Sequence, residues 1–242
     1  MSDKVESFAH EKLKGRYRTR YQSPNLRDFL EHPDQDLKKF GGSRIKGDET
    51  TTTTVDLVSD LVEECPIYIK RYNTKNAWHA LRRTVRRSRA ENCWIYADIL
   101  QNLGVAIAPP VAFIQEYLGT GLKGGSWYLS KYMGPYCLDH LPIIDDEAVR
   151  VRVMEQIVEI MAILRNHHIS HGDMKATNLL LAAGNRVVLL DLDAMKEHFT
   201  ADRARTGINK DMVRFLQNWR DQPALLELAR EKLQWAGFTL PN

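Results

Sequence analysis

A short polar segment in the second half of the sequence carries residue types that suit phosphoryl transfer. The segment is His171-Gly-Asp-Met-Lys-Ala-Thr-Asn178, and Asp191 follows it after two apolar runs. Phosphoryl transfer needs a cation at the phosphates, oxygen ligands for magnesium, and a carboxylate that orients or deprotonates the acceptor hydroxyl. Asp173 could face the acceptor and Lys175 the transferring phosphate, while Asn178 and Asp191 offer oxygens to the metal. The joint spacing of these four residues favours catalysis over a chance group of solvated side chains.

Apolar patterns around this segment predict the elements that position it. A helix is expected from the acidic residues at 145–147 onward, with apolar residues at helical spacing, and it leads directly into His171. Residues 179–181 and 187–190 predict two strands around the turn Ala183-Gly184-Asn185. Such a hairpin would hold Asp173 and Asp191 near each other. Residues 211–219 and 223–235 are expected to be helical.

The first half of the sequence predicts strands and one helix. Residues 50–54, 67–72, 105–114 and 126–132 favour extended structure, and glycines at 40–49 and 119–125 favour turns. Residues 76–102 show a helical period that runs through Trp78, Leu81 and Val85.

This order of elements predicts an α+β fold with two lobes. The first lobe is a small antiparallel sheet with one helix, and the C-terminal lobe is mainly helical. The expected division is a basic extension at 1–39, a nucleotide-binding lobe at 40–137, and a lobe with the catalytic loop and the acceptor site at 138–242.

The composition indicates a globular protein of a reducing compartment. The chain has 242 residues, 43% of them hydrophobic, and its net charge of +3 is too small to indicate a dedicated nucleic-acid binder. Its three cysteines form no Cys-x-x-Cys pair, which favours a reduced cytosolic location. The N-terminus lacks the apolar core of a signal peptide, and the longest apolar stretch contains Pro109 and Pro110, so no membrane span is expected.

Lys70 is the second candidate cation. It lies between apolar and aromatic residues of the predicted strand 67–72, where an unpaired ammonium group would be costly to bury. Contact with a nucleotide is therefore favoured over an ordinary lysine at a strand edge.

The polar segment resembles the catalytic loop of protein kinases, and Leu190-Asp-Leu-Asp193 resembles their Asp-Phe-Gly segment. Gly172 stands where protein kinases have arginine, and Asp193 stands where they have glycine. These two departures resemble the bacterial lipopolysaccharide kinases of the Kdo/WaaP family. Lys70, Arg89-Ala-Glu91 and the stretch from Leu103-Gly104 to Pro110 are also similar to that family, so the likeness covers roughly residues 40–220.

The resemblance implies transfer of the ATP γ-phosphate to a heptose or Kdo hydroxyl of the lipopolysaccharide inner core. ATP and Mg²⁺ are the implied cofactors, the core glycolipid is the implied partner, and the expected location is cytoplasmic, at the inner face of the bacterial inner membrane. Lys70 would bind the α and β phosphates and Glu91 would orient Lys70, although Glu91 could instead pair with Arg87. Backbone groups of Lys131, Tyr132 and Met133 would receive the adenine, and the turn around 46–50 would cover the phosphates.

Several alternatives remain at this stage. A small-molecule or protein kinase of the same fold would carry similar residues, and a pseudokinase binding module could keep the fold without the activity. His171 is expected to pack structurally. Asp193 could bind magnesium or hydrogen-bond the loop, and Asp211 could brace the catalytic loop or be a solvated charge.

Two basic clusters could face an anionic membrane or a phosphorylated glycolipid, or could be ordinary solvated surface. Neither has aromatic residues interleaved as a stacking surface, which argues against RNA. One cluster lies near the N-terminus and the other on the predicted helix: Lys12, Lys14, Arg16, Arg18 and Arg20, and Arg82, Arg83, Arg86, Arg87 and Arg89.

Overall fold

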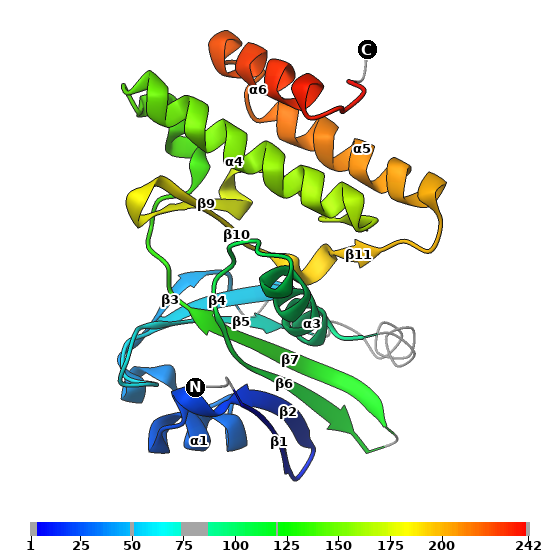
Figure 1. Cartoon of the computed structure of the whole chain (residues 1–242). Helices are drawn as coiled ribbons and strands as arrows, with labels where there is room; N and C mark the ends of the chain where they lie inside the picture. Colours follow the sequence, from blue (N-terminus) through cyan, green and yellow to red (C-terminus); the bar gives the residue numbers. More distant parts are fainter. Residues whose placement is uncertain (1–3, 49–50, 74–86, 120, 241–242) are drawn as a thin grey trace. The chain divides into compact units, whose positions relative to one another are not determined.

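The structure is a computed structural model that describes residues 4–48, 51–73, 87–119 and 121–240. It has an α+β fold, as predicted, and divides into two compact units (Figure 1). The sheet unit comprises residues 1–97 and 108–132, and the helical unit comprises residues 98–107 and 133–242. The predicted helix residues Trp78, Leu81 and Val85 lie outside the described residues, as do Thr50 and the arginines at 82, 83 and 86.

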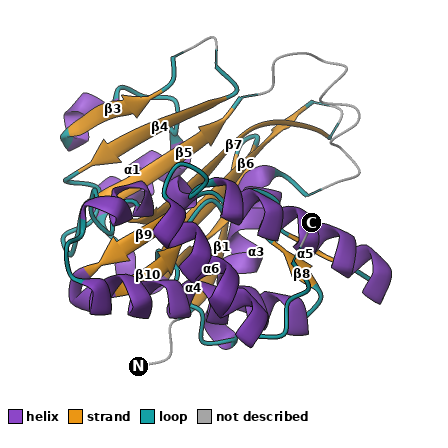
Figure 2. Cartoon of the chain, turned by 90° about the horizontal axis from the view of Figure 1, so that it is seen from above, coloured by secondary structure: helices purple, strands orange, loops and turns teal. Residues whose placement is uncertain are grey.

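The sheet unit is built on seven antiparallel strands in the order β1-β2-β6-β7-β5-β4-β3. Figure 2 shows β3, β4, β5, β7 and β6 side by side in this order. The strands span Val5–His10 (β1), Leu13–Arg18 (β2), Gly42–Lys46 (β3), Thr53–Val58 (β4), Ile67–Tyr72 (β5), Pro110–Leu118 (β6) and Leu122–Lys131 (β7). The strand predicted at 67–72 matches β5, whereas β6 and β7 begin at other residues than expected.

The N-terminal segment differs from the expected basic extension, because residues 4–39 are integrated into the sheet unit. Strand β2 pairs with β6 along its length. Along β2, Leu13 and Gly15 are buried while Lys14 and Arg16 are exposed, so the strand has the alternation of a half-buried sheet surface. The density of basic residues concealed this period in the sequence.

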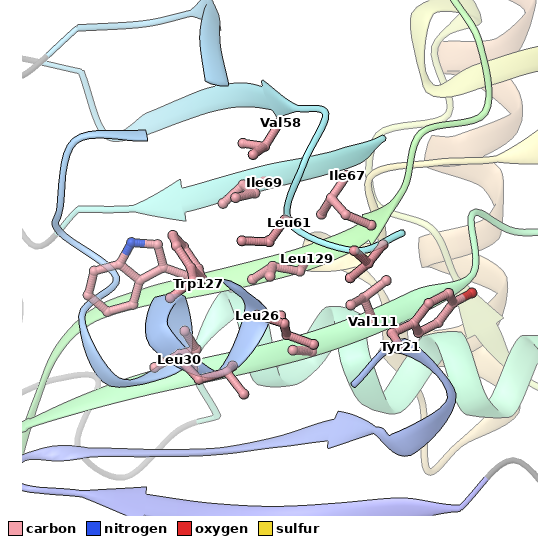
Figure 3. Close-up of a cluster of buried hydrophobic side chains, with 14 of the residues drawn as sticks. Tyr21, Leu26, Leu30, Val58, Leu61, Ile67, Ile69, Val111, Trp127 and Leu129 are labelled. Atoms are coloured by element: carbon pink, nitrogen blue, oxygen red, sulfur yellow. The ribbon is translucent and has the colours of Figure 1, made fainter. Parts of the chain in front are cut away.

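Helix α1 (Pro24–Glu31) covers one face of the sheet and α3 (Arg89–Asn102) covers the other (Figure 1). The Ser23 hydroxyl caps α1 by accepting the N–H of Leu26 at 2.9 Å. Figure 3 shows Leu26 and Leu30 of α1 packed against residues of the sheet in one buried cluster. This cluster includes Ile67, Ile69, Val111, Trp127 and Leu129.

Among its described residues, the helical unit has three α-helices of its own, a hairpin and one short strand pair. The helices are α4 (Glu147–Asn166), α5 (Ala201–Gln217) and α6 (Pro223–Trp235); the hairpin strands are β9 (Leu179–Ala182) and β10 (Arg186–Leu189); and β8 (Ile169–Ser170) pairs with β11 (Lys196–Glu197). The predicted hairpin is confirmed, and α6 has the predicted bounds. Helix α5 begins ten residues earlier than expected, because the Thr200 hydroxyl caps it by accepting the N–H of Arg203.

Helix α4 fixes the hairpin that follows the polar segment 171–178, the candidate catalytic loop, which is called the catalytic segment below. The side-chain amide of Gln156 donates to the carbonyl of Asn185 at 2.8 Å and accepts the N–H of Val187 at 3.0 Å. Gly184 and Asn185 have φ values of +73° and +58°, which these two residue types tolerate in a tight turn. The position of the hairpin is therefore set by the helix that precedes the catalytic segment.

Candidate active site

The catalytic segment begins where β8 ends, and α5 holds its first two residues. The carboxylate of Asp211 accepts the backbone N–H of His171 at 2.6 Å and that of Gly172 at 2.8 Å. Asp211 is only 4% exposed, and burial raises its pKa, although His171 and the two N–H groups oppose this rise. Of the two interpretations of Asp211, the structure supports the brace.

His171 links the catalytic segment to the second carboxylate segment. Its side chain is fully buried, as expected for a packing role. Its Nε2 lies 2.9 Å from the carbonyl oxygen of Leu190, and its Nδ1 accepts the N–H of Asp173 at 3.3 Å. Both contacts fit one tautomer, with the hydrogen on Nε2. Residues 171, 173 and 190 are thereby held in one cluster, next to Asp191.

Gly172 is required by the backbone, which explains the departure from arginine at this position. Its φ is +87°, a region that side chains rarely adopt, and an added Cβ would lie 2.8 Å from the carbonyl oxygen of Ala194. A larger residue would push the catalytic segment away from the turn that follows Asp191.

Asp173, Lys175 and Asn178 are in direct contact. The Nζ of Lys175 lies 2.7 Å from Oδ2 of Asp173, and the Asn178 amide donates to the same oxygen at 3.2 Å and to the Asp173 carbonyl at 2.9 Å. Arg214, on α5, places its Nε 3.5 Å from Oδ1 of Asp173. Arg214 is not among the residues expected from the sequence, although its position three residues after Asp211 puts both on nearby parts of one helix face.

These neighbours keep Asp173 ionised. Burial alone would raise the pKa of Asp173, but the hydrogen bond and charge of Lys175, the amide of Asn178 and the charge of Arg214 together bring it below the ordinary value. The side chain is 36% exposed, so it can still be reached by an acceptor molecule. An ionised, accessible carboxylate suits a group that orients or accepts the proton of an acceptor hydroxyl.

Asn178 and Asp191 are brought together by the hairpin. The N–H of Leu190 donates to the carbonyl of Asn178 at 2.8 Å, and Asp191 is the next residue along the chain. Asp191 has φ +59° and ψ +57°, a left-handed conformation that is uncommon for a residue with a side chain, although aspartate adopts it more often than most, and that clusters at active sites. Because the Asn178 nitrogen is committed to Asp173, its Oδ1 is the atom that can face a cation.

A hard cation is the kind of metal that these two residues fit. The described residues contain no group of three or more His, Cys, Asp or Glu side chains that could hold a metal. A pair of protein oxygens is nevertheless typical of magnesium, which takes most of its remaining ligands from phosphates and water. The donor set therefore fits Mg²⁺ bound together with a nucleotide.

Lys70 and Glu91 belong to the sheet unit. Lys70 alternates with Ile69 and Arg71 along β5, so its side chain leaves on the face that also bears Tyr72. That face is covered by α3, where the Tyr72 hydroxyl lies 3.5 Å from the Cys93 sulfur. Glu91, in the first turn of α3, has its Oε2 3.6 Å from Nζ of Lys123 on β7. The expected orientation of Lys70 by Glu91 stays a prediction.

Two of the backbone N–H groups expected to contact adenine already donate hydrogen bonds within the sheet unit. The N–H of Lys131 donates to the carbonyl of Pro109, and that of Tyr132 donates to the carbonyl of Pro66, each at 2.9 Å. The expected contact of residues 131–133 with adenine stays a prediction.

Several residues of the two basic clusters contact other residues of the protein. Arg18 is 6% exposed and lies over the Trp94 ring, and Lys12 pairs with Glu116 at 2.6 Å. Arg89 lies over the Tyr72 ring and donates to the Thr53 hydroxyl. These residues have structural partners, so neither cluster is wholly a free cationic surface.

Comparison with known proteins gives one family match. The sequence model of the lipopolysaccharide kinase (Kdo/WaaP) family matches residues 45–236, which is most of the chain and includes the whole catalytic segment. A search of curated proteins finds no match. Among the helices that the structure describes, none combines the length and apolar character that a membrane span requires.

Proposed function

We propose that this chain, which belongs to the lipopolysaccharide kinase (Kdo/WaaP) family, phosphorylates a heptose or Kdo hydroxyl of the lipopolysaccharide inner core. The chain is a kinase with the two-lobed kinase-like fold, and its use of ATP and of a lipopolysaccharide-related acceptor follows from membership of the family. The choice of sugar and the residues that act on it are the parts that we propose.

The direct contact of Asp173 with Lys175 and Asn178 is the observation that carries the proposal. In the proposed reaction the Asp173 carboxylate accepts a hydrogen bond from the acceptor hydroxyl and takes its proton as the oxygen attacks the γ-phosphorus. The bond from the γ-phosphorus to the β–γ bridging oxygen breaks, and ADP leaves. Lys175 offsets the negative charge of the transferring group.

Asn178 and Asp191 would hold the metal. Mg²⁺, when bound, would supply positive charge against the β and γ phosphate oxygens. The chain would contribute Asn178 Oδ1 and the carboxylate of Asp191, whose positions are fixed by the hairpin. Lys70 would pair with the α and β phosphates, and Glu91 would orient Lys70.

The proposed location is the cytoplasmic face of the bacterial inner membrane, because a lipid-anchored acceptor must be reached there. In this proposal, residues 40–137 serve the nucleotide, and residues 138–242 hold the catalytic segment and the acceptor. Kinases of the same fold that act on small molecules or proteins remain the competing functions.

The cellular test is the phosphate content of the core oligosaccharide. Mass spectrometry of core isolated from cells with and without this protein should show the loss of phosphate on one sugar when the protein is missing. Restoring the wild-type gene should bring the phosphate back, and restoring Asp173→Asn should not. An unchanged core in all strains would contradict the proposed acceptor.

A further inference from the structure

We infer that the helical unit carries a second binding site, a surface at the end of α4 and the start of α5 that docks on an anionic lipid bilayer. The inference deepens the proposed function, since it rests on an acceptor that is anchored in a membrane. The surface consists of a groove of about 660 Å³ and two exposed aromatic side chains that lie within two residues of its lining along the chain. It is called the tail groove below, because the C-terminal tail forms one wall.

The lining of the tail groove is apolar at its base and cationic at its edges. Its base includes Ala204, Ile208 and Met212, which recur along one side of α5 and are all buried. Its edges include Arg165, Arg205 and His168. None of its lining residues within the described chain is an aspartate or a glutamate.

The wall formed by the C-terminal tail is held in place by α4. The Nη1 of Arg165 donates to the carbonyl of Gly237 at 3.0 Å, and the Arg165 guanidinium lies 4.2 Å from the centroid of the Phe238 ring. A groove with fixed walls can bind a ligand without first ordering them, which lowers the cost of binding.

Two large aromatic side chains that are close in sequence to residues lining the tail groove face solvent. Phe199, two residues before the lining residue Ala201, is 98% exposed, and Trp235, two residues before Gly237, is 81% exposed. The N–H of His198 donates to the carbonyl of His168 at 2.9 Å, which keeps Phe199 beside the edge of the groove. Aromatic rings exposed in this way are typical of surfaces that meet a bilayer at the level of the headgroups.

An anionic phospholipid is the partner that fits both parts. One acyl chain would occupy the apolar base. The phosphate would compete for Arg205 with the exposed carboxylate of Asp202, whose Oδ1 lies 3.7 Å from Nη1 of Arg205, because arginine matches phosphate geometry. Asp211 and Arg214, whose side chains contact the catalytic segment, are not among the residues that line the tail groove.

The test is sedimentation of the full-length chain with vesicles of phosphatidylcholine alone or mixed with phosphatidylglycerol. The wild type should bind the anionic vesicles and not the neutral ones. Arg205→Glu should lower the partition coefficient at least about five-fold, because each cation near an anionic surface contributes about that factor. Phe199→Ser should also lower it. Both residues are exposed, and thermal unfolding would verify that the variants fold.

Matched controls are Arg186→Glu on β10, which makes the same charge change, and Ile143→Ser, which removes an apolar side chain that is 73% exposed. Both should bind like the wild type. Equal binding of neutral vesicles, unchanged binding by the groove variants, or equal loss by the controls would overturn the inference. A dimer in analytical ultracentrifugation that Phe199→Ser dissociates would also overturn it, because a second copy would then cover the surface.

Activity on a soluble acceptor tests the proposed function separately from the docking surface. With core oligosaccharide from which the acyl chains have been removed, Arg205→Glu and Phe199→Ser should turn over like the wild type. If the wild type phosphorylates neither this acceptor nor intact lipopolysaccharide, the proposed function is wrong, whereas the vesicle result still decides the docking surface.

Discussion

Asp173 is contacted by two cations and one amide, and their combined effect on its charge is the main electrostatic feature of the site. Lys175, Arg214 and Asn178 each favour the ionised carboxylate. An acceptor hydroxyl that approaches Asp173 therefore meets a base that carries its charge throughout the neutral range. The role of this residue is best separated from that of Asp191 by measuring turnover and nucleotide binding in parallel.

Asp173→Asn should lower kcat by about 10²- to 10⁴-fold, the range typical of a lost general base, and leave ATP affinity nearly unchanged. Asp191→Ala should instead weaken the magnesium-dependent part of ATP binding, because it removes a metal ligand. Steady-state kinetics and calorimetric titration of ATP with and without Mg²⁺ measure both effects. Equal loss of ATP binding in the two variants would show that the assigned roles are wrong.

Lys175→Met should change the pH dependence of the reaction. The pKa of Asp173 is lowered in the folded protein, and the hydrogen bond and charge of Lys175 are the leading causes that oppose burial. Removing Lys175 should therefore raise the pKa of Asp173 and move the acid limb of the kcat/KM profile to higher pH. The exposed Lys210 on α5 offers the control variant Lys210→Met, whose profile should match the wild type.

The same shift predicts a change in stability with pH. Because the folded pKa of Asp173 lies below its unfolded value, its ionised form stabilises the fold above the unfolded value, and this contribution is lost as pH falls through the folded pKa. In Lys175→Met the contribution should be smaller and should disappear at higher pH. Urea unfolding across the acid range measures it, and identical curves for the two proteins would contradict the electrostatic account.

At the scale of elements, α5 determines the geometry of the catalytic segment through one buried carboxylate. Asp211→Asn replaces an acceptor oxygen with an amide nitrogen that cannot accept a backbone N–H. The free energy of unfolding should fall by about 1–3 kcal/mol, with a loss of kcat as His171 and Gly172 shift. Asp202→Asn, on the same helix and 90% exposed, is the control. In chemical denaturation, the free energy of unfolding of the control should equal that of the wild type. An equally unchanged value for Asp211→Asn would show that Asp211 does not brace the catalytic segment.

The role of Glu91 depends on how α3 meets the sheet. If Glu91 orients Lys70, Glu91→Gln should raise the KM for ATP several-fold, while Lys123→Met should leave it unchanged. If Glu91 serves only its 3.6 Å contact with Lys123, both variants should lower stability alike with an unchanged KM for ATP. Measuring KM and the unfolding midpoint of both variants separates these outcomes.

The elements with a clean periodic pattern could be predicted from the sequence, and those whose pattern is mixed with charge could not. Helix α6 and the β9–β10 hairpin have strong apolar periods bounded by Pro223 and by Gly184-Asn185. Along strand β2, buried and exposed residues alternate as in a sheet, but the exposed residues are basic, so the segment resembles a solvated extension in the sequence.

The same distinction applies to the site. The sequence is enough to recognise Asp173, Lys175, Asn178 and Asp191, because these residues lie close together along the chain. Arg214 reaches Asp173 only through the packing of α5 near the catalytic segment, which a local pattern does not encode. The burial of Asp211, which decided between its two interpretations, is likewise a consequence of tertiary structure.

At the scale of the whole molecule, the family match begins at residue 45, inside β3, whereas the sheet unit begins with β1. Strand β2 pairs with β6, and α1 supplies Leu26, Phe29 and Leu30 to the buried cluster. The segment before the matched range is thus part of the sheet unit. Any assay of the proposed reaction should use the full chain for this reason.

The most direct measurement is phosphate transfer from [γ-³²P]ATP to purified lipopolysaccharide inner core by the full-length chain, with the labelled sugar identified by mass spectrometry. The account predicts magnesium-dependent label on one heptose or Kdo hydroxyl with the wild type and almost none with Asp173→Asn. Label that appears only on protein, label that persists in Asp173→Asn, or ATP binding without any transfer to the core would contradict it.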